Sequence, residues 1–159
     1  MENSNLDKII QTTDAKIIAK LNKDVQTLHH EIEPELFKPF NELEMSHYFE
    51  EMLSLIGVAG YVIFHGDAPA GYMLTSRKTS DETPFKFRTD TLHIDQICVE
   101  SRFKGLGLGK KLVDHAKQIA RDNKIPRVEM NFWTQNPNSG EFFSHEGFEV
   151  FNERMVFKL

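Results

Sequence analysis

A glycine-rich turn among basic side chains is the part of this sequence best suited to chemistry. Gly105, Gly107 and Gly109 alternate with larger residues, and the window 102–111 contains four basic residues and no acid. Glycine has no Cβ atom, so the backbone can approach a ligand closely. Apolar residues at helical spacing follow immediately, and a helix N-terminus offers free N–H groups to phosphate. The pattern predicts a site for a phosphorylated ligand.

Two common phosphate-binding motifs do not fit this turn. A Walker loop ends in Gly-Lys-Ser/Thr, but Lys111 follows Gly109-Lys110, and Lys104 stands where the first glycine is required. The dinucleotide fingerprint fails because Lys110 takes its third glycine position. A nucleotide-binding protein is therefore the least favoured hypothesis. A tight strand-to-helix turn without any ligand is a further interpretation of the glycines alone.

The turn resembles the acyl-CoA loop of the GNAT superfamily of N-acetyltransferases, which reads Gln/Arg-x-x-Gly-x-Gly/Ala. One departure is Lys104, because the family usually has Gln or Arg there. A register that begins at Arg102 restores the Arg but misplaces the helix start by two residues. The resemblance implies that main-chain amides bind the diphosphate of coenzyme A. The predicted cofactor-binding residues of the loop are Lys104, Gly105, Leu106, Gly107, Leu108, Gly109 and Lys110.

A second stretch resembles the last motif of the same family, Asn-x-x-Ala-x-x-Phe-Tyr-x-x-x-Gly-Phe. Asn136, Phe142, Gly147 and Phe148 fall in register, and Ser139 takes the small-residue position. Asn can cap the start of a helix and Gly can end one, so a capped helix without any ligand is the alternative interpretation. The resemblance further implies that this helix packs along the pantetheine arm of the cofactor. It adds four predicted cofactor-binding residues, Asn136, Ser139, Phe142 and Phe143.

The strand before the loop changes phase near its end. Leu92 and Ile94 alternate with polar residues, but the next apolar residues are Ile97 and Val99, which predicts a β-bulge. In the GNAT family this strand bulges beside the thioester. The resemblance implies that backbone N–H groups there polarise the thioester carbonyl. The cofactor-binding residues predicted on this strand are Ile97, Cys98 and Val99.

His93 and Asp95 are the predicted catalytic residues. They are two residues apart on a strand, so both side chains point to one face. An amine is protonated at neutral pH and must lose a proton before it attacks a thioester. Members of the family often carry a Glu or His base at these positions. The base is left open between His93, Asp95 and water, and ordinary strand residues are the alternative interpretation.

Phe143 is the clearest departure from the family pattern. The family usually has Tyr there, whose hydroxyl protonates the departing thiolate. Phe143 has no such proton, so the thiolate leaves unassisted or Ser144, His145 or water replaces the Tyr. This departure supports an alternative hypothesis, in which the chain is a non-catalytic acyl-CoA-binding sensor or regulatory module.

The composition favours a cytoplasmic domain. The 159 residues are 40% hydrophobic, which suits one domain with a sizeable core. The single cysteine, Cys98, cannot form an internal disulfide and is interpreted as a small core residue. No targeting segment is apparent, and the longest apolar run, 55–64, is too short to span a bilayer. A net charge of -5 argues against nucleic-acid partners, and no metal is expected.

Apolar spacing, capping residues and prolines predict the elements. Leu43, Tyr48, Met52 and Leu55 are expected on one side of the second helix, and 77–84 is expected to be a mobile connector. Helices are predicted at 14–30, at 41–56, after the loop and after Asn136. Strands are predicted at 8–12, 61–65, 71–75, 87–99 and 128–133, with a final strand or hairpin at 148–159.

The predicted fold is a single-domain α/β acyl-CoA N-acyltransferase (GNAT) fold, with a mixed, mostly antiparallel sheet whose bulged, splayed central strands are flanked by helices. Residues 1–58 would contribute helices to the acceptor site, and 59–159 would form the core with the acyl-CoA site. The leading functional hypothesis is an N-acetyltransferase that moves an acetyl group from acetyl-CoA to a primary amine of a small molecule or protein by direct attack, as a monomer or homodimer. The acceptor is left open.

Overall fold

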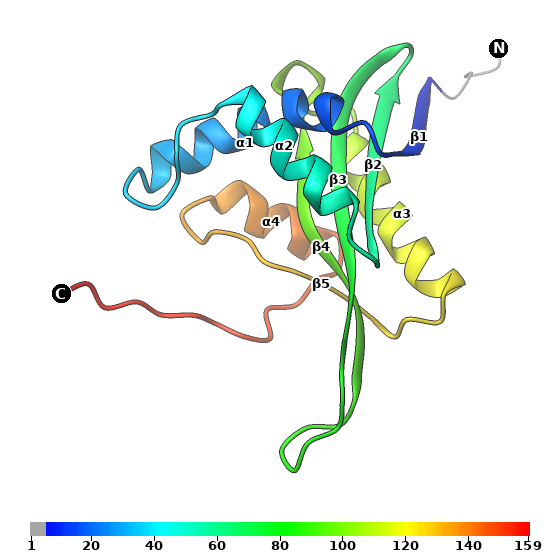
Figure 1. The fold of residues 1–159 in the computed structure, drawn as a ribbon, viewed down its shortest axis with the longest axis vertical. Coiled ribbons are helices and arrows are strands. Elements are labelled where there is room, and N and C mark those ends of the chain that lie inside the picture. Colours follow the sequence, from blue (N-terminus) through cyan, green and yellow to red (C-terminus); the bar gives the residue numbers. More distant parts are fainter. Residues whose placement is uncertain (1–5) are drawn as a thin grey trace.

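A computed structural model describes residues 6–159 as a five-stranded sheet with helices on both faces (Figure 1). The strands are β1 (Asp7–Thr12), β2 (Val58–His65), β3 (Ala68–Ser80), β4 (Thr89–Val99) and β5 (Arg127–Met130). The helices are α1 (Ala15–Ile32), α2 (Glu42–Leu53), α3 (Leu108–Asp122) and α4 (Pro137–His145), with a short 3-10 helix at Ser101–Phe103.

The strands follow one another in chain order across the sheet. Strands β1 to β4 pair antiparallel, and β5 pairs parallel to β4. The parallel pair requires a crossover, which α3 supplies. The predicted mixed, mostly antiparallel sheet between helices is confirmed. The predicted bulge is confirmed as well: Leu74 faces Gln96 and Thr75 faces Ile94, so Asp95 is the extra residue on β4.

Each face of the sheet packs against a different set of helices. Leu108, Leu112 and Ala116 of α3 pack against Met73 and Ile94 on one face. On the other face α1 and α2 cover a second cluster of buried residues, Ala15, Ile18, Ala19, Leu21, Phe49, Val62, Tyr72 and Leu74. Successive side chains of a strand point to opposite faces, so β3 and β4 contribute to both clusters.

The first two helices begin at capping residues. Asp14 accepts hydrogen bonds from the backbone N–H groups of Lys16 and Ile17, at 3.0 and 3.2 Å. Asn41 accepts one from Glu44, at 3.1 Å. Both starts agree with the sequence, because Asp and Asn satisfy free N–H groups at helix N-termini.

The predicted apolar side of α2 is confirmed at Met52 and wrong at the other three residues. Leu43, Tyr48 and Leu55 are exposed, whereas Phe49 is fully buried. The side of α2 that faces the sheet carries Met45, Phe49, Met52 and Leu53, at helical spacing.

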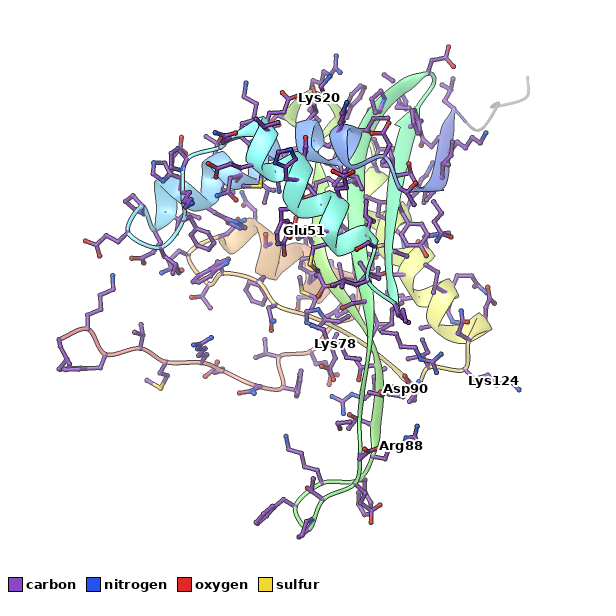
Figure 2. All side chains as sticks on the ribbon, viewed as in Figure 1. Lys20, Glu51, Lys78, Arg88, Asp90 and Lys124 are labelled. Carbon is purple, nitrogen blue, oxygen red and sulfur yellow. The ribbon has the colours of Figure 1, made fainter. Side chains whose placement is uncertain are left out.

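The connector predicted at 77–84 is also wrong for its first half. Residues 77–80 continue β3 and pair with the first residues of β4, so a two-stranded arm projects from the body (Figure 1). Arg77 binds Asp90 through two hydrogen bonds, Nη2 to Oδ2 at 2.6 Å and Nε to Oδ1 at 2.9 Å. Ser80 and Thr89 hydroxyls pair at 2.6 Å. Polar side chains line both sides of the arm, and Figure 2 shows Lys78, Arg88 and Asp90 among them.

The final strand predicted at 148–159 is not present in the structure. Phe148 packs against the core of the α3 face, but residues 149–159 form neither strand nor helix and run outward from the body (Figure 1). The strand predicted at 128–133 is shorter as well, since β5 ends at Met130.

Candidate functional site

Strands β4 and β5 separate at the point where β4 bulges. The parallel pairing runs only from Thr91 to Ile94 on β4, and β4 then continues to Val99 without a neighbour on that side. The N–H of Glu100 donates to Ala70 of β3, at 2.8 Å. Because successive amides of a strand point to alternate edges, those of Ile97 and Val99 point into the gap and that of Cys98 points to β3. Neither amide has an acceptor among the described residues, so the gap presents two free donors.

The glycine loop presents a row of backbone amides. The N–H of Lys104 bonds within the 3-10 helix, and the first bond of α3 runs from Lys111 N–H to Gly107 O, at 3.2 Å. From Gly105 to Lys110, no backbone N–H has a hydrogen-bond acceptor among the described residues. These six consecutive amides precede or open α3, so they lie at the positive end of its dipole.

Two of the glycines are required by backbone conformation. Gly105 and Gly107 have φ values of 81° and 76°, in the left-handed region that side chains disfavour. A Cβ atom on either would meet nothing within 4 Å, so the space beside the loop is open. Gly109 differs, because its Cβ would lie 3.3 Å from the ring of Phe142. That glycine allows α4 to approach the start of α3.

The second family motif forms α4. Phe143 is buried and packs edge-on against Phe142 and Phe148, with ring centroids at 4.9 and 5.6 Å. Gly147 ends the helix with a φ of 85°, as expected from the sequence. Asn136 occupies the N-cap position, but its side chain makes no capping hydrogen bond. Ser139 donates its backbone N–H to Asn136 O, at 3.2 Å.

Asp24 of α1 holds the start of the loop, a contact that the sequence did not indicate. Its Oδ2 accepts from both the backbone N–H and the hydroxyl of Ser101, at 2.8 and 2.7 Å. Two hydrogen bonds lower the pKa of Asp24, first that from the Ser101 side chain and then that from the Ser101 backbone.

The basic residues around the loop differ in their partners. Lys110 binds Asp114 and Arg102 binds Glu100, whereas Lys104 forms no ion pair with a described residue.

His93 and Asp95 are brought together, as predicted. His93 Nδ1 lies 2.9 Å from Asp95 Oδ1, and Lys78 Nζ lies 3.2 Å from the same oxygen. Burial alone would raise the pKa of Asp95. Hydrogen bonds from His93 and Ser76 and the charge of Lys78 outweigh it, so the pKa lies below its ordinary value. An ionised carboxylate only accepts, so Nδ1 of His93 is the donor, and Nε2 is the ring nitrogen left to exchange a proton with another group.

Three buried side-chain oxygen atoms, on α1, β3 and β4, lack a hydrogen-bond partner of standard geometry among the described residues. They are Asp95 Oδ2, Ser76 Oγ and Asn22 Oδ1. Buried polar atoms are normally paired, so unpaired ones mark places where water or a ligand completes the bonding.

A buried chain of polar groups joins α1 to the bulge. Asn22 donates to the Tyr72 hydroxyl at 2.8 Å, and that hydroxyl donates to Gln96 Oε1 at 2.7 Å. Burial raises the pKa of Tyr72 far above its ordinary value, so its hydroxyl stays protonated. Alternation on β3 predicts Tyr72 inside, but its partners lie 50 and 24 residues away, too far for sequence patterns to pair them.

Cys98 lies on the face covered by α1, next to the buried cluster there. Burial raises the pKa of its thiol to about 11. The thiol is therefore protonated at neutral pH and is a poor nucleophile, which agrees with its interpretation as a small core residue.

Residues 25–148 match the acetyltransferase (GNAT) family. The match spans most of the chain, including both motifs, the bulged strand and the His93–Asp95 pair. The chain belongs to the GNAT acetyltransferase family.

Solved structures with the same GNAT fold include three that illustrate its range. A tetramutant of the BH1408 protein from Bacillus halodurans is 17% identical, with a TM-score of 0.88 over 96% of this chain and 99% of that chain. A possible acetyltransferase from Clostridium difficile 630 is 16% identical, with a TM-score of 0.76 over 98% of each chain. The aminoglycoside N-acetyltransferase AAC(6')-Iy, in complex with CoA, is 16% identical, with a TM-score of 0.68 over 96% and 93%.

No helix of residues 6–159 is long and apolar enough to cross a membrane. No group of three or more His, Cys, Asp or Glu side chains in the same range is arranged to hold a metal ion.

Proposed function

We propose that this chain is an N-acetyltransferase that moves an acetyl group from acetyl-CoA to a primary amine of a small molecule or protein. Membership of the GNAT family supports acetyltransferase activity in general. The observation that carries the use of coenzyme A is the row of six free amides from Gly105 to Lys110. Such a row at a helix N-terminus suits a diphosphate, because each N–H donates to a phosphate oxygen.

The loop has the properties that coenzyme A requires. The amides need an acceptor from outside the described residues, and the space beside Gly105 and Gly107 is open. Lys104 adds positive charge without an ion-pair partner among the described residues, and the side chain of Asn136 is free of a capping bond. We infer that the loop holds the diphosphate and that Asn136 binds the pantetheine arm.

The free edge of β4 would receive the acyl group. Acetyl-CoA supplies an activated acyl thioester, whose carbonyl oxygen becomes negative as an amine attacks. The N–H groups of Ile97 and Val99 point into the gap between β4 and β5 and can stabilise that charge. Both groups belong to a strand fixed by its pairing with β3, so they need not reorganise during the reaction.

His93 is the favoured general base. Nε2 takes the proton of the attacking amine, a C–N bond forms, and the C–S bond breaks as the thiolate leaves. Asp95 holds the ring in the required tautomer and stabilises the imidazolium that results. Asp95 itself is a weak base, because its pKa lies below the ordinary value. Phe143 supplies no proton, and a thiolate is a leaving group stable enough to depart without one.

A second candidate function is a non-catalytic acyl-CoA sensor, which Phe143 favours. Its buried ring replaces the family's usual acid with a packing residue, so the chain could bind the cofactor without turning it over. Both functions predict binding of coenzyme A, and only the first predicts thiol release.

Calorimetry with CoA, acetyl-CoA, ATP and NAD tests the binding step. We expect binding of CoA and acetyl-CoA alone. Gly107→Ala should weaken it by about tenfold, because a side chain disfavours positive φ by about 1–2 kcal/mol and shifts the amides. Gly66→Ala is the matched control, since Gly66 also has positive φ and open space but lies in the turn between β2 and β3. Equal losses in both variants, or no heat from CoA with wild type, would overturn the assignment of the loop.

Thiol release from acetyl-CoA with a panel of amines tests the chemistry. The panel should contain aminoglycosides, because AAC(6')-Iy acts on that class, together with polyamines, amino acids and peptides. Turnover with any amine that falls in His93→Gln supports the enzyme. Tight acetyl-CoA binding without turnover on every amine would favour the sensor.

A further inference from the structure

Lys78 brings an amine to the His93–Asp95 pair. It lies on β3, where the arm joins the body of the molecule (Figure 2), and it is paired with Thr91 of β4. Alternation along β3 from Leu74, which is buried under α1 and α2, puts Lys78 on the same face of the sheet. Its Nζ crosses to β4 and lies 3.2 Å from Asp95 Oδ1. The functional group of the proposed acceptor, a primary amine, is therefore already present beside the proposed base.

The ion pair of Lys78 differs from that of its neighbour. Arg77 binds Asp90, a carboxylate of the arm itself. Lys78 instead reaches the carboxylate that also binds His93. The Lys78 side chain is 55% exposed, and ion pairs with an exposed partner are weak. The amine can therefore leave Asp95 and move to other groups nearby.

The proposed position of the thioester is close to this amine. The acyl carbonyl would lie at the N–H groups of Ile97 and Val99, and Asp95 precedes Ile97 by two residues on the same strand. A strand rises about 3.3 Å per residue, so the carboxylate and the first of these amides are about 7 Å apart along β4. A lysine side chain is a flexible four-carbon stem, which can move its amine over such a distance.

We propose that Lys78 is a site of self-acetylation, at which the chain transfers an acetyl group from acetyl-CoA to its own Nζ atom. This inference rests on the proposed acetyltransferase function. The Lys78 ammonium loses one proton to solvent and a second to His93 as Nζ attacks the thioester carbon. The C–N bond of an amide forms and the C–S bond breaks. Coenzyme A leaves with the electron pair as a thiolate, which takes a proton from water.

The contacts of the His93–Asp95 pair single out one lysine. Among residues 6–159, no lysine other than Lys78 forms a hydrogen bond or ion pair with either residue. Acetylation would remove the charge of Lys78 and with it the ion pair to Asp95. An external amine needs the same base and the same thioester, so Lys78 and an added acceptor would compete for acetyl groups.

Mass spectrometry of the full chain, incubated with acetyl-CoA and no added amine, tests the proposal. We expect one acetyl group per chain, located on Lys78 by peptide mapping. Lys86 is the matched internal control, because it is an exposed lysine of the same arm but lies between the two strands, at the tip. Uncatalysed acetylation would label both lysines. Lys78 should react about 100-fold faster or more, since a general base contributes at least that factor.

Two variants test the mechanism. His93→Gln should lower the rate at Lys78 to that at Lys86. Lys78→Arg keeps a cation beside Asp95, but a guanidinium stays protonated and should not be labelled. When the two variants are mixed, Lys78 of the His93→Gln chain should stay unmodified, because the transfer is intramolecular. A saturating amine substrate should slow the labelling of wild type, and circular dichroism melts report whether each variant is folded.

Equal labelling of Lys78 and Lys86 in wild type would overturn the proposal, and this comparison needs no variant. A rate that His93→Gln leaves unchanged would also overturn it, as would labelling of the His93→Gln chain by the Lys78→Arg chain. Thiol release and calorimetry separate these results from a failure of the proposed function. If wild type acetylates an added amine while Lys78 stays unlabelled, self-acetylation is wrong and the acetyltransferase function stands. If acetyl-CoA does not bind, both are wrong.

Discussion

The two faces of the sheet are packed with different kinds of side chains, although the same strands build both. The face under α3 is an apolar layer, in which Leu112 meets Met73 and Ile94. The face under α1 and α2 also buries Asn22 and Ser76. All three buried polar atoms without a partner among the described residues belong to that second face: Asn22 Oδ1, Ser76 Oγ and Asp95 Oδ2.

This difference indicates that one face of the sheet serves mainly stability and the other mainly function. An unpaired buried polar atom lowers stability by about 1–3 kcal/mol, so a face built for stability alone would not retain three of them. The α3 face contributes apolar packing, whereas the other face carries the His93–Asp95 pair and the chain of polar groups from Asn22 to Gln96. We interpret the first as the folding face and the second as the face that binds the acceptor amine.

The largest effect is expected on the polar face. His93→Gln removes the proposed base but keeps a side chain that can hydrogen-bond to Asp95. General bases contribute about 100-fold to 10,000-fold, so kcat/KM should fall by that factor, and the limb of the pH profile that rises with pH should disappear. Steady-state rates of thiol release across pH measure both. The melting temperature should change little, because His93 adds no apolar packing to the core.

A wild-type pH profile in His93→Gln, with only a few-fold loss of rate, would assign proton removal to water or to Asp95. Asp95→Asn then becomes the decisive variant. An amide can force the opposite tautomer of His93, so under the proposed mechanism Asp95→Asn should approach the loss seen in His93→Gln.

The next largest effect is expected on the face under α3, where a substitution should lower stability and leave turnover unchanged. Leu112→Ala leaves a cavity under the sheet, because Leu112 is fully buried. The free energy of unfolding should fall by about 2–5 kcal/mol, as measured by urea denaturation. Turnover of the folded fraction at low temperature should stay close to wild type. A large loss of kcat at full folding would show that the two faces are not separable.

The features that could be predicted from the sequence depend on residues close together in the chain. The glycine loop, the bulge at Asp95 and the left-handed Gly147 each occupy a few consecutive residues whose types restrict the backbone. The α3 face was also predictable, because a mostly apolar layer leaves a clear helical period. His93 and Asp95 were found because two residues on one strand share a face whatever the rest of the fold.

The features that could not be predicted are side chains whose contacts lie far away in the sequence and segments that project into solvent. Asp24 binds Ser101 across 77 residues, so no local pattern connects them. The arm has polar side chains on both faces, because it projects from the core, and therefore lacks the alternation that marks a strand. A strand or hairpin was also predicted at 148–159, yet residues 149–159 form neither strand nor helix.

Asp24 connects elements from the two sides of the sheet, because it joins α1 through hydrogen bonds to Ser101, just before the loop that leads into α3. Asp24→Asn should weaken coenzyme A binding by about twofold to fivefold at neutral pH, because charge-assisted hydrogen bonds exceed neutral ones. The pKa of Asp24 is lowered in the folded chain, so its contribution is present above the ordinary carboxyl range and is lost as the pH falls through the folded value. Urea unfolding of both proteins measures this.

The stability difference between wild type and Asp24→Asn should be constant from pH 7 to 5 and should shrink below about pH 4. Glu100→Gln is a suitable control, because Glu100 also precedes the loop but binds only Arg102 among the described residues. A difference that grows on acidification would contradict the ionised state of Asp24.

The smallest effects, and the sharpest contrast between the faces, are expected at two adjacent residues of β3. Thr75 is buried on the α3 face, where its hydroxyl partly offsets the burial that raises the pKa of Tyr61, and Ser76 is buried on the other face without a partner of standard geometry among the described residues. Thr75→Val should lower the free energy of unfolding by about 1 kcal/mol, because it removes a buried hydroxyl that interacts with Tyr61. Ser76→Ala should raise it by up to about 1 kcal/mol, because it removes an unpaired hydroxyl. Ser76→Ala should nonetheless slow turnover, since that hydroxyl also lowers the pKa of Asp95.

One folding face and one binding face should therefore respond differently. Ser76→Ala should gain stability and lose rate, whereas Thr75→Val should lose stability alone. Equal losses of stability at both would contradict that division.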